Sequence, residues 1–265
     1  MGVGYLFGCL LSIIMWKVDR HELFYKFNTL LRKRLKNNAY IQLFYLIFVG
    51  VLCLLISLIS NKELQNGVVA FLVIEVSNSE RKTLINKTID KKHFYDTLSI
   101  ISRSLVCGFI APIVYIICFG NVGGIAYTLI YYISFDSTLS VFNFLNRILN
   151  IIPSLITVAI LYVIYVPRNK TFKIDFKGDF STNIIYEPLL NVYILSAYIE
   201  SVNFYYHIEK KNVHYLKSYG VYTNKINDVS IKDFLSLIYS VCFIVFVAFW
   251  LYKAEIVSFL VLNLF

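Results

Sequence analysis

Four polar side chains within nine residues form a set that could do chemistry: Asp179, Ser181, Asn183 and Glu187. Two carboxylates, a hydroxyl and an amide could hold Mg²⁺ and phosphate, because hard cations prefer oxygen ligands. The same residue types also cap helices, and a helix beginning near Glu187 could use them in that way. On spacing alone, capping is favoured over a metal site.

Other motifs are weaker. The run Gly120–Gly124 lacks the spacing of a phosphate-binding loop, so we interpret it as a turn between apolar helices. No metal-binding pattern includes any of the four histidines, which all lie in polar stretches: His21, His93, His207 and His214. The sequence therefore predicts no metal site. The five cysteines lie in apolar runs without a CxxC pair, as is typical of small apolar residues in a membrane.

The composition indicates which solvent surrounds these groups. Hydrophobic residues make up 58% of the 265 residues and charged residues 15%, with a mean hydropathy of +0.67. These values exclude a disordered chain and predict an integral membrane protein, whose main partner is the lipid bilayer. The net charge of +9 could suggest nucleic acid in a soluble protein. Here the basic residues cluster beside apolar runs, so we expect cytoplasmic loops and no nucleic-acid partner.

Long uncharged runs predict the membrane segments. Full spans are expected at 40–60, 98–120, 148–166 and 235–252, with a retained first helix at 3–18 and shorter runs at 67–76 and 123–135. The predicted fold class is all-α: a polytopic integral membrane helical bundle with about five to seven membrane segments. Gly4 and Gly8 form a GxxxG spacing, which would let another helix approach closely.

Basic loops set the predicted orientation. Residues 17–39, 78–96 and 167–234 carry most of the lysine and arginine and are expected in the cytoplasm. The run 123–135 then cannot be a full crossing, so we expect a re-entrant or tilted helix. We predict one membrane domain, 1–265, whose largest aqueous or interfacial portion is 167–234, because that stretch is rich in tyrosine and phenylalanine.

Three motifs carry a resemblance to a known family. They are Cys107-Gly-Phe-Ile-Ala-Pro-Ile-Val-Tyr115, the glycines 120, 123 and 124 leading to Ala126-Tyr127, and Leu149-Asn-Ile-Ile-Pro153. In this order they resemble the cobalamin biosynthesis membrane protein family CobD/CbiB. The resemblance extends to His21, to a basic helix at 24–35, and to Ser181-Thr-Asn183 followed by Glu187.

The resemblance implies an activity and a site. The activity is that of an adenosylcobinamide-phosphate synthase, which uses ATP and Mg²⁺ to join adenosylcobyric acid to an aminopropanol phosphate through an amide bond. The implied catalytic residues are Asp179 and Glu187, and the implied substrate-binding residues are His21, Ser181, Asn183 and Asn150. A corrinoid substrate and a multi-pass location in a bacterial cell membrane follow from the same resemblance. The bias toward Ile, Phe, Tyr, Lys and Asn is also typical of an AT-rich bacterial genome.

The chain departs from the family pattern where acidic and amide groups are expected. The residues at those positions are Arg103, Ser104, Cys107, Tyr131, Ser134, Asn146 and Arg147. Such replacements remove the anionic oxygens that hold a divalent cation. Two hypotheses remain: a divergent enzyme that uses Asp136, Asp179 and Glu187 instead, or a protein that kept the fold and lost or changed the reaction. The second would make it a non-catalytic membrane signalling or scaffold protein, similar to AmpE-like proteins.

Overall fold

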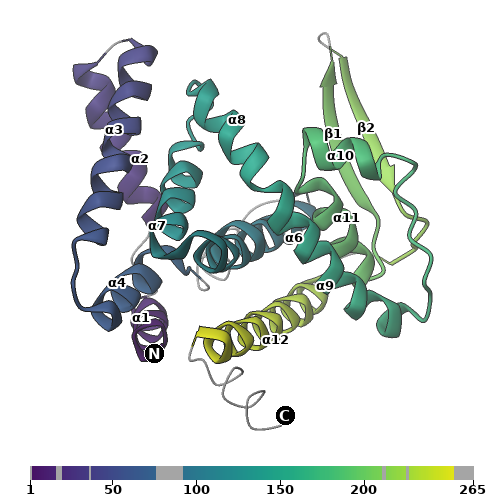
Figure 1. Ribbon diagram of the computed structural model, residues 1–265. Coiled ribbons are helices and arrows are strands. Elements are labelled where there is room, and N and C mark those ends of the chain that lie inside the picture. The colour runs from purple at the N-terminus through teal and green to yellow at the C-terminus, as the bar shows by residue number, and fades with distance from the viewer. Residues whose placement is uncertain are drawn as a thin grey trace, which may run out of the picture. The chain divides into compact units, whose positions relative to one another are not determined.

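The computed structural model describes residues 2–15, 20–35, 37–75, 92–210, 213–224 and 227–253, without the side chains of 21, 92–96, 207–210 and 213–215 (Figure 1). The elements are α1 (Val3–Ile14), α2 (Arg20–Arg34), α3 (Asn38–Ser57), α4 (Lys62–Val73), α6 (Lys92–Leu105), the π-helix η2 (Val106–Ile110), α7 (Ala111–Ile133), α8 (Ser140–Leu149), α9 (Ile151–Asn169), α10 (Phe180–Tyr186), α11 (Leu190–Ile199), β1 (Phe204–Lys210), β2 (Val213–Tyr219) and α12 (Asp228–Lys253). This confirms the predicted all-α membrane class.

Four helical segments in the described part of the chain are long and apolar enough to cross a membrane: Asn38–Ser57, Thr97–Ile133, Ile151–Asn169 and Asp228–Lys253. Each of them overlaps one of the four predicted full spans. Two shorter apolar helices, Val3–Ile14 and Leu190–Ile199, accompany them. The predicted first helix is thus shorter than its apolar run, and the number of membrane segments, five to seven, stays a prediction.

By their contacts the residues form two compact units, each assembled from distant parts of the chain. Unit 1 contains the described residues within 1–78, 107–149 and 240–265, and unit 2 those within 79–106 and 150–239. Each unit has its own core and its own polar cluster, and each is described separately below.

Close packing of α1 against α4 holds one side of unit 1 together. A Cβ atom added at Gly4 would lie 2.0 Å from the backbone oxygen of Glu63, and one added at Gly8 would lie 2.2 Å from that of Gly67. Only glycine leaves room for backbones this close. The carboxylate of Glu63 also accepts hydrogen bonds from the backbone N–H groups of Gly2 (2.9 Å) and Gly4 (2.6 Å). The close approach predicted from the GxxxG spacing is confirmed.

Pro112, two residues after the π-helix η2, explains why this helix forms. Pro112 has no N–H to donate to the carbonyl of Gly108, four residues earlier, so the α-helical ladder cannot continue unchanged. The backbone N–H of Glu75 donates to that carbonyl instead, at 3.0 Å. A Cβ atom at Gly108 would lie 3.1 Å from the carbonyl oxygen of Glu75. The glycine therefore lets the chain after α4 reach the freed carbonyl.

A sharp kink at Gly120 interrupts α7. Gly120 has φ 70° and ψ −166°, a conformation that glycine adopts far more readily than other residues. The expected break in the apolar run is present, but residues 121–124 are helical rather than a turn. The predicted turn over 120–124 is therefore reduced to a single residue. Whether 123–135 is re-entrant stays a prediction.

Unit 2 is built around α11, all of whose residues except Tyr193 are buried. It packs against α9 and α6, and the hydroxyl of Ser102 donates to that of Ser196 at 2.7 Å. The antiparallel hairpin of β1 and β2 pairs Phe204 with Tyr219 at its open end (Figure 1). The predicted aqueous portion, 167–234, thus includes an apolar buried helix and a hairpin that the sequence did not suggest.

Candidate functional site

The two predicted catalytic carboxylates lie in unit 2 and contact the hairpin. Asp179 precedes α10 and forms an ion pair with Lys217, and it accepts a hydrogen bond from the hydroxyl of Tyr219 at 3.2 Å. Glu187 follows α10 and accepts a hydrogen bond from the hydroxyl of Tyr206. The side chains of Asp179 and Lys217 are about one-third exposed. Both carboxylates therefore already have a donor from their own chain.

The other members of the polar set are used differently. The amide nitrogen of Asn183 donates to the side-chain oxygen of Asn191 (2.9 Å), whose own amide nitrogen donates to the carbonyl of Phe180 (2.9 Å). Ser181 is exposed. None of the four side chains caps a helix: Asp179 occupies the N-cap position of α10 without a capping bond, and Leu189 does so for α11. The capping interpretation is therefore wrong, because Asn183 joins α10 to α11 instead.

The remaining predicted substrate-binding residues are Asn150 and His21. Asn150 is buried at the start of α9, where its carbonyl accepts from the backbone N–H of Ser154 at 3.0 Å. His21 lies in α2, but its side chain falls outside the described residues, as do those of His93, His207 and His214.

The acidic groups do not fit a bound divalent cation. Within the described ranges no three side chains of His, Cys, Asp or Glu lie close enough to share a metal ion. The carboxylate of Asp179 faces an ammonium group, and that of Glu187 a phenol. An ammonium group in contact with a carboxylate competes with a cation for the same oxygens. Among the described side chains, those implied by the resemblance are therefore not arranged as a Mg²⁺ site.

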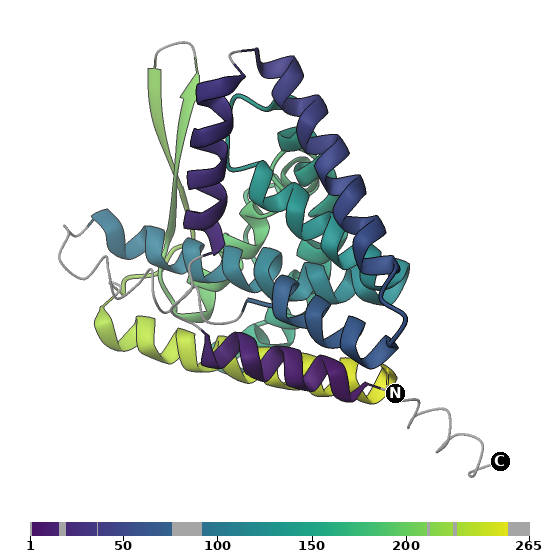
Figure 2. The same cartoon turned by 90° about the vertical axis from the view of Figure 1, so that its left-hand side faces the viewer.

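Unit 1 contains a pocket that the sequence did not predict. It has a volume of about 740 Å³ and lies among α2, α3, the end of α7 and the loop that follows α7. The end of α2 lies near the start of α3, and the two helices diverge from there (Figure 2). The pocket is lined by polar groups of Asn28, Arg32 and Asp136 and by several aromatic rings. A volume of this size suits a small organic molecule.

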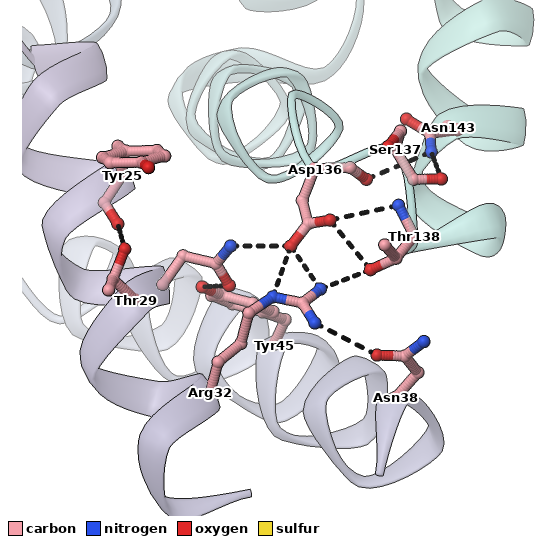
Figure 3. A network of polar contacts seen from close by, with 10 residues as sticks. Tyr25, Thr29, Arg32, Asn38, Tyr45, Asp136, Ser137, Thr138 and Asn143 are labelled. Carbon is pink, nitrogen blue, oxygen red and sulfur yellow. Dashed lines mark hydrogen bonds and ion pairs between the residues drawn. The ribbon is translucent and has the colours of Figure 1, made fainter. Parts of the chain in front are cut away.

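A hydrogen-bond network centred on Asp136 forms one wall (Figure 3). The carboxylate accepts from Nδ2 of Asn28 (2.7 Å), from Nε of Arg32 (2.8 Å) and from Nη2 of Arg32. It also accepts from the backbone N–H and the hydroxyl of Thr138, at 3.1 and 2.8 Å. Burial acts to raise the pKa of Asp136, but these hydrogen bonds outweigh it and hold the pKa below its ordinary value.

Aromatic side chains with fixed orientations form the other walls. Phe24 stacks on Tyr132 with ring centroids 5.1 Å apart and planes at 16°. The hydroxyl of Tyr132 donates to the buried carboxylate of Glu75, and the hydroxyl of Tyr45 donates to Oδ1 of Asn28 at 2.9 Å. Because their hydroxyl groups are held, these rings present stable apolar surfaces. The rings of Tyr132 and Tyr45 are thus held in place at the pocket wall.

One signal in the sequence could have revealed this pocket. Phe24, Asn28 and Arg32 recur every four residues, so they share one face of a helix. The prediction of a basic cytoplasmic loop at 17–39 does not use this face. Asp136 appeared only as an alternative catalytic carboxylate, and its partner Arg32 lies 104 residues earlier. No spacing rule covers that separation.

The motifs of the family resemblance meet at Tyr115 in unit 1. Its ring stacks on that of Tyr127, with centroids 4.9 Å apart, and its hydroxyl donates to the carbonyl of Leu149 at 2.7 Å. Comparison of the chain with protein-family models, curated proteins and solved structures found no match.

Proposed function

We propose that this chain is a membrane protein related to the CobD/CbiB family of cobalamin biosynthesis. In this proposal it has lost the ligase reaction and acts by binding, as a scaffold or signalling protein. One observation carries the proposal: each carboxylate available for catalysis has a partner within the chain. Lys217 pairs with Asp179, Tyr206 donates to Glu187, and Arg32 pairs with Asp136. Donors held against a carboxylate make it a weaker base, and a metal site needs several carboxylate oxygens, which the described residues do not bring together.

The resemblance supports the kind of fold rather than the reaction. Tyr115 contacts both Tyr127 and Leu149, and the three residues come from three motifs, as expected if those motifs maintain a shared architecture. The acidic positions of the pattern carry Arg103, Cys107 and other residues that cannot hold Mg²⁺. Retention of the motifs without the acids favours a binding role.

An active synthase is the second candidate, and one observation favours it. Asp179 lies beside Lys217 and Tyr219, and all three groups can exchange protons. The side chain of Asp179 is about one-third exposed, so a substrate could reach it. In this hypothesis the ion pair would position the carboxylate instead of occupying it.

Complementation separates the two candidates. A strain without adenosylcobinamide-phosphate synthase receives the wild-type chain or the D179N variant, with membrane expression verified for both. The binding proposal predicts that neither chain restores growth under conditions in which the strain must make its own cobalamin. Growth with the wild type that is lost in D179N would establish the synthase and overturn the proposal.

We further propose that the protein lies in a bacterial cell membrane and that loop 170–179 of unit 2 faces the cytoplasm. Lys177 is exposed in this loop, so K177C offers a labelling site in a variant whose five native cysteines are replaced. Membrane-impermeant maleimide should label it in inverted vesicles and not in intact spheroplasts. The reverse pattern would refute this orientation.

A further inference from the structure

The charges that line the pocket of unit 1 do not cancel. Arg32 and Lys33 carry two positive charges and Asp136 one negative charge, which leaves a formal charge of +1. The Asp136 carboxylate already accepts five hydrogen bonds from the chain. A ligand therefore meets a neutralised carboxylate and an excess of positive charge, which favours an anion.

Cationic donors remain for such an anion. Lys33 is exposed, and within the described ranges no acidic side chain forms an ion pair with it. Of the five N–H groups of Arg32, four have partners: Asp136 accepts two, Thr138 one and Asn38 one. The fifth, on Nη1, has no acceptor in the described part of the chain. Arg32 is thus held in place and keeps one donor.

The other walls suit an apolar group. The stacked rings of Phe24 and Tyr132 and the exposed ring of Tyr25 line the same pocket. The hydroxyl of Tyr132 is occupied by Glu75, so this ring offers little besides its apolar face. A flat ring or a hydrocarbon chain packs well on such surfaces.

We propose that the pocket binds an organic anion, in which a phosphate or carboxylate group is joined to an apolar body. Lys33 and the free donor of Arg32 contact the anion, and the aromatic walls contact the apolar body. The anion comes either from an acidic phospholipid or from a soluble organic phosphate, since both have this chemistry. The proposal goes beyond a scaffold role by naming a site and a ligand class.

The soluble source is tested with the full chain in nanodiscs of phosphatidylcholine alone. Isothermal titration with naphthyl phosphate should show saturable binding. Naphthol and inorganic phosphate, which each supply half of the ligand, should bind at least about tenfold more weakly, because each lacks one set of contacts.

Matched variants locate the site. K33Q should weaken naphthyl phosphate binding about tenfold, which is the loss of one charge-assisted contact. K26Q is the control, because Lys26 lies on the same helix, pairs with Glu22 at 2.8 Å and does not line the pocket. Y25A should also weaken binding, whereas Y40A, which removes an equally exposed ring elsewhere, should not.

The lipid source is tested by native mass spectrometry in mixed phosphatidylcholine and phosphatidylglycerol. If K33Q retains less phosphatidylglycerol than the wild type and K26Q does not, the site binds a lipid, even if naphthyl phosphate does not bind. Competition between the two ligands would show one shared site. If neither ligand distinguishes K33Q from K26Q, the proposal is wrong.

Discussion

Each unit contains an ion pair between an arginine and a carboxylate, yet the two carboxylates differ. In unit 1, Asp136 accepts five hydrogen bonds, and its side chain is 14% exposed. In unit 2, the Glu200 side chain is 4% exposed and its Oε2 accepts from Nη2 of Arg168 at 3.0 Å; Oε1 lies 3.0 Å from the same nitrogen in the ion pair but has no hydrogen-bond partner among the described residues. The pairs share their chemistry and differ in their number of donors.

This difference decides the direction of each pKa. Burial raises the pKa of Glu200, Asp233 adds to the rise, and the opposing effect of Arg168 is too small to reverse it. Burial also acts on Asp136, but its several donors lower the pKa. An arginine partner alone therefore does not stabilise a buried carboxylate; enough further donors must compensate for the lost water.

The largest effect is expected for D136N. The amide keeps the shape but loses the charge, so Arg32 and Asn28 lose a strong acceptor. We expect a loss of about 2 to 3 kcal/mol in the free energy of unfolding. Reversible unfolding in mixed micelles measures it. A loss no larger than that of the surface variant K26Q would contradict the network's role.

The dependence of stability on pH should have opposite signs in the two units. Asp136 has a lowered pKa, so its stabilisation is complete above its ordinary value of about 3.9 and is lost as the pH falls through the folded-state pKa. Glu200 has a raised pKa, so its ionisation lowers stability as the pH rises from about 4.3 through the folded-state pKa.

Unfolding between about pH 6 and pH 2 measures both contributions, because the stabilisation by Asp136 is lost below its ordinary pKa of about 3.9. The free energy of unfolding of D136N should lie below that of the wild type, and this difference should shrink as the pH falls. The stability of E200Q should fall relative to the wild type over the same range. The double variant should show neither pH dependence. If the stabilities of D136N and E200Q change in the same direction relative to the wild type, the two carboxylates do not differ as described.

Removal of a single donor should have an intermediate effect. Y45F removes the hydroxyl that donates to Asn28 at 2.9 Å, and we expect a loss of about 1 kcal/mol. Circular dichroism during thermal unfolding checks this value. Y40F, which changes an exposed tyrosine on the same helix, is the control and should unfold like the wild type.

E200Q should change stability least. Replacement of a buried carboxylate by an amide removes a desolvation cost, while Arg168, whose side chain is 37% exposed, can still reach water. We expect a change within about 1 kcal/mol of the wild type at neutral pH. The same unfolding measurement tests it, and a loss equal to that of D136N would show that donor number does not matter.

The sequence predicts the elements that depend on local patterns. The apolar run 40–60 corresponds to α3, and the spacing of Gly4 and Gly8 predicts the close contact with α4, because run length and small residues act locally. The hairpin and α11 were missed. Helix α11 has ten residues, too few for a membrane-span signal, and the hairpin lies in a polar, charged stretch.

The site was predicted less well than the fold. The polar set 179–187 was recognised by its spacing, but its partners Tyr206 and Lys217 come from a hairpin that the sequence did not suggest. The contact between Arg32 and Asp136 joins a helix to a distant loop. Such pairs form only when tertiary packing brings the segments together, so local patterns cannot reveal them.

Direct titration of the two carboxylates tests this account most directly. The chain labelled with carbon-13 at aspartate and glutamate carboxyl groups, with D136N and E200Q to assign the signals, reports each pKa in detergent micelles. The account predicts that Asp136 titrates below about 3.9 and Glu200 above about 4.3. If both titrate below their ordinary values, or Asp136 titrates above its own, the number of donors does not distinguish the two ion pairs.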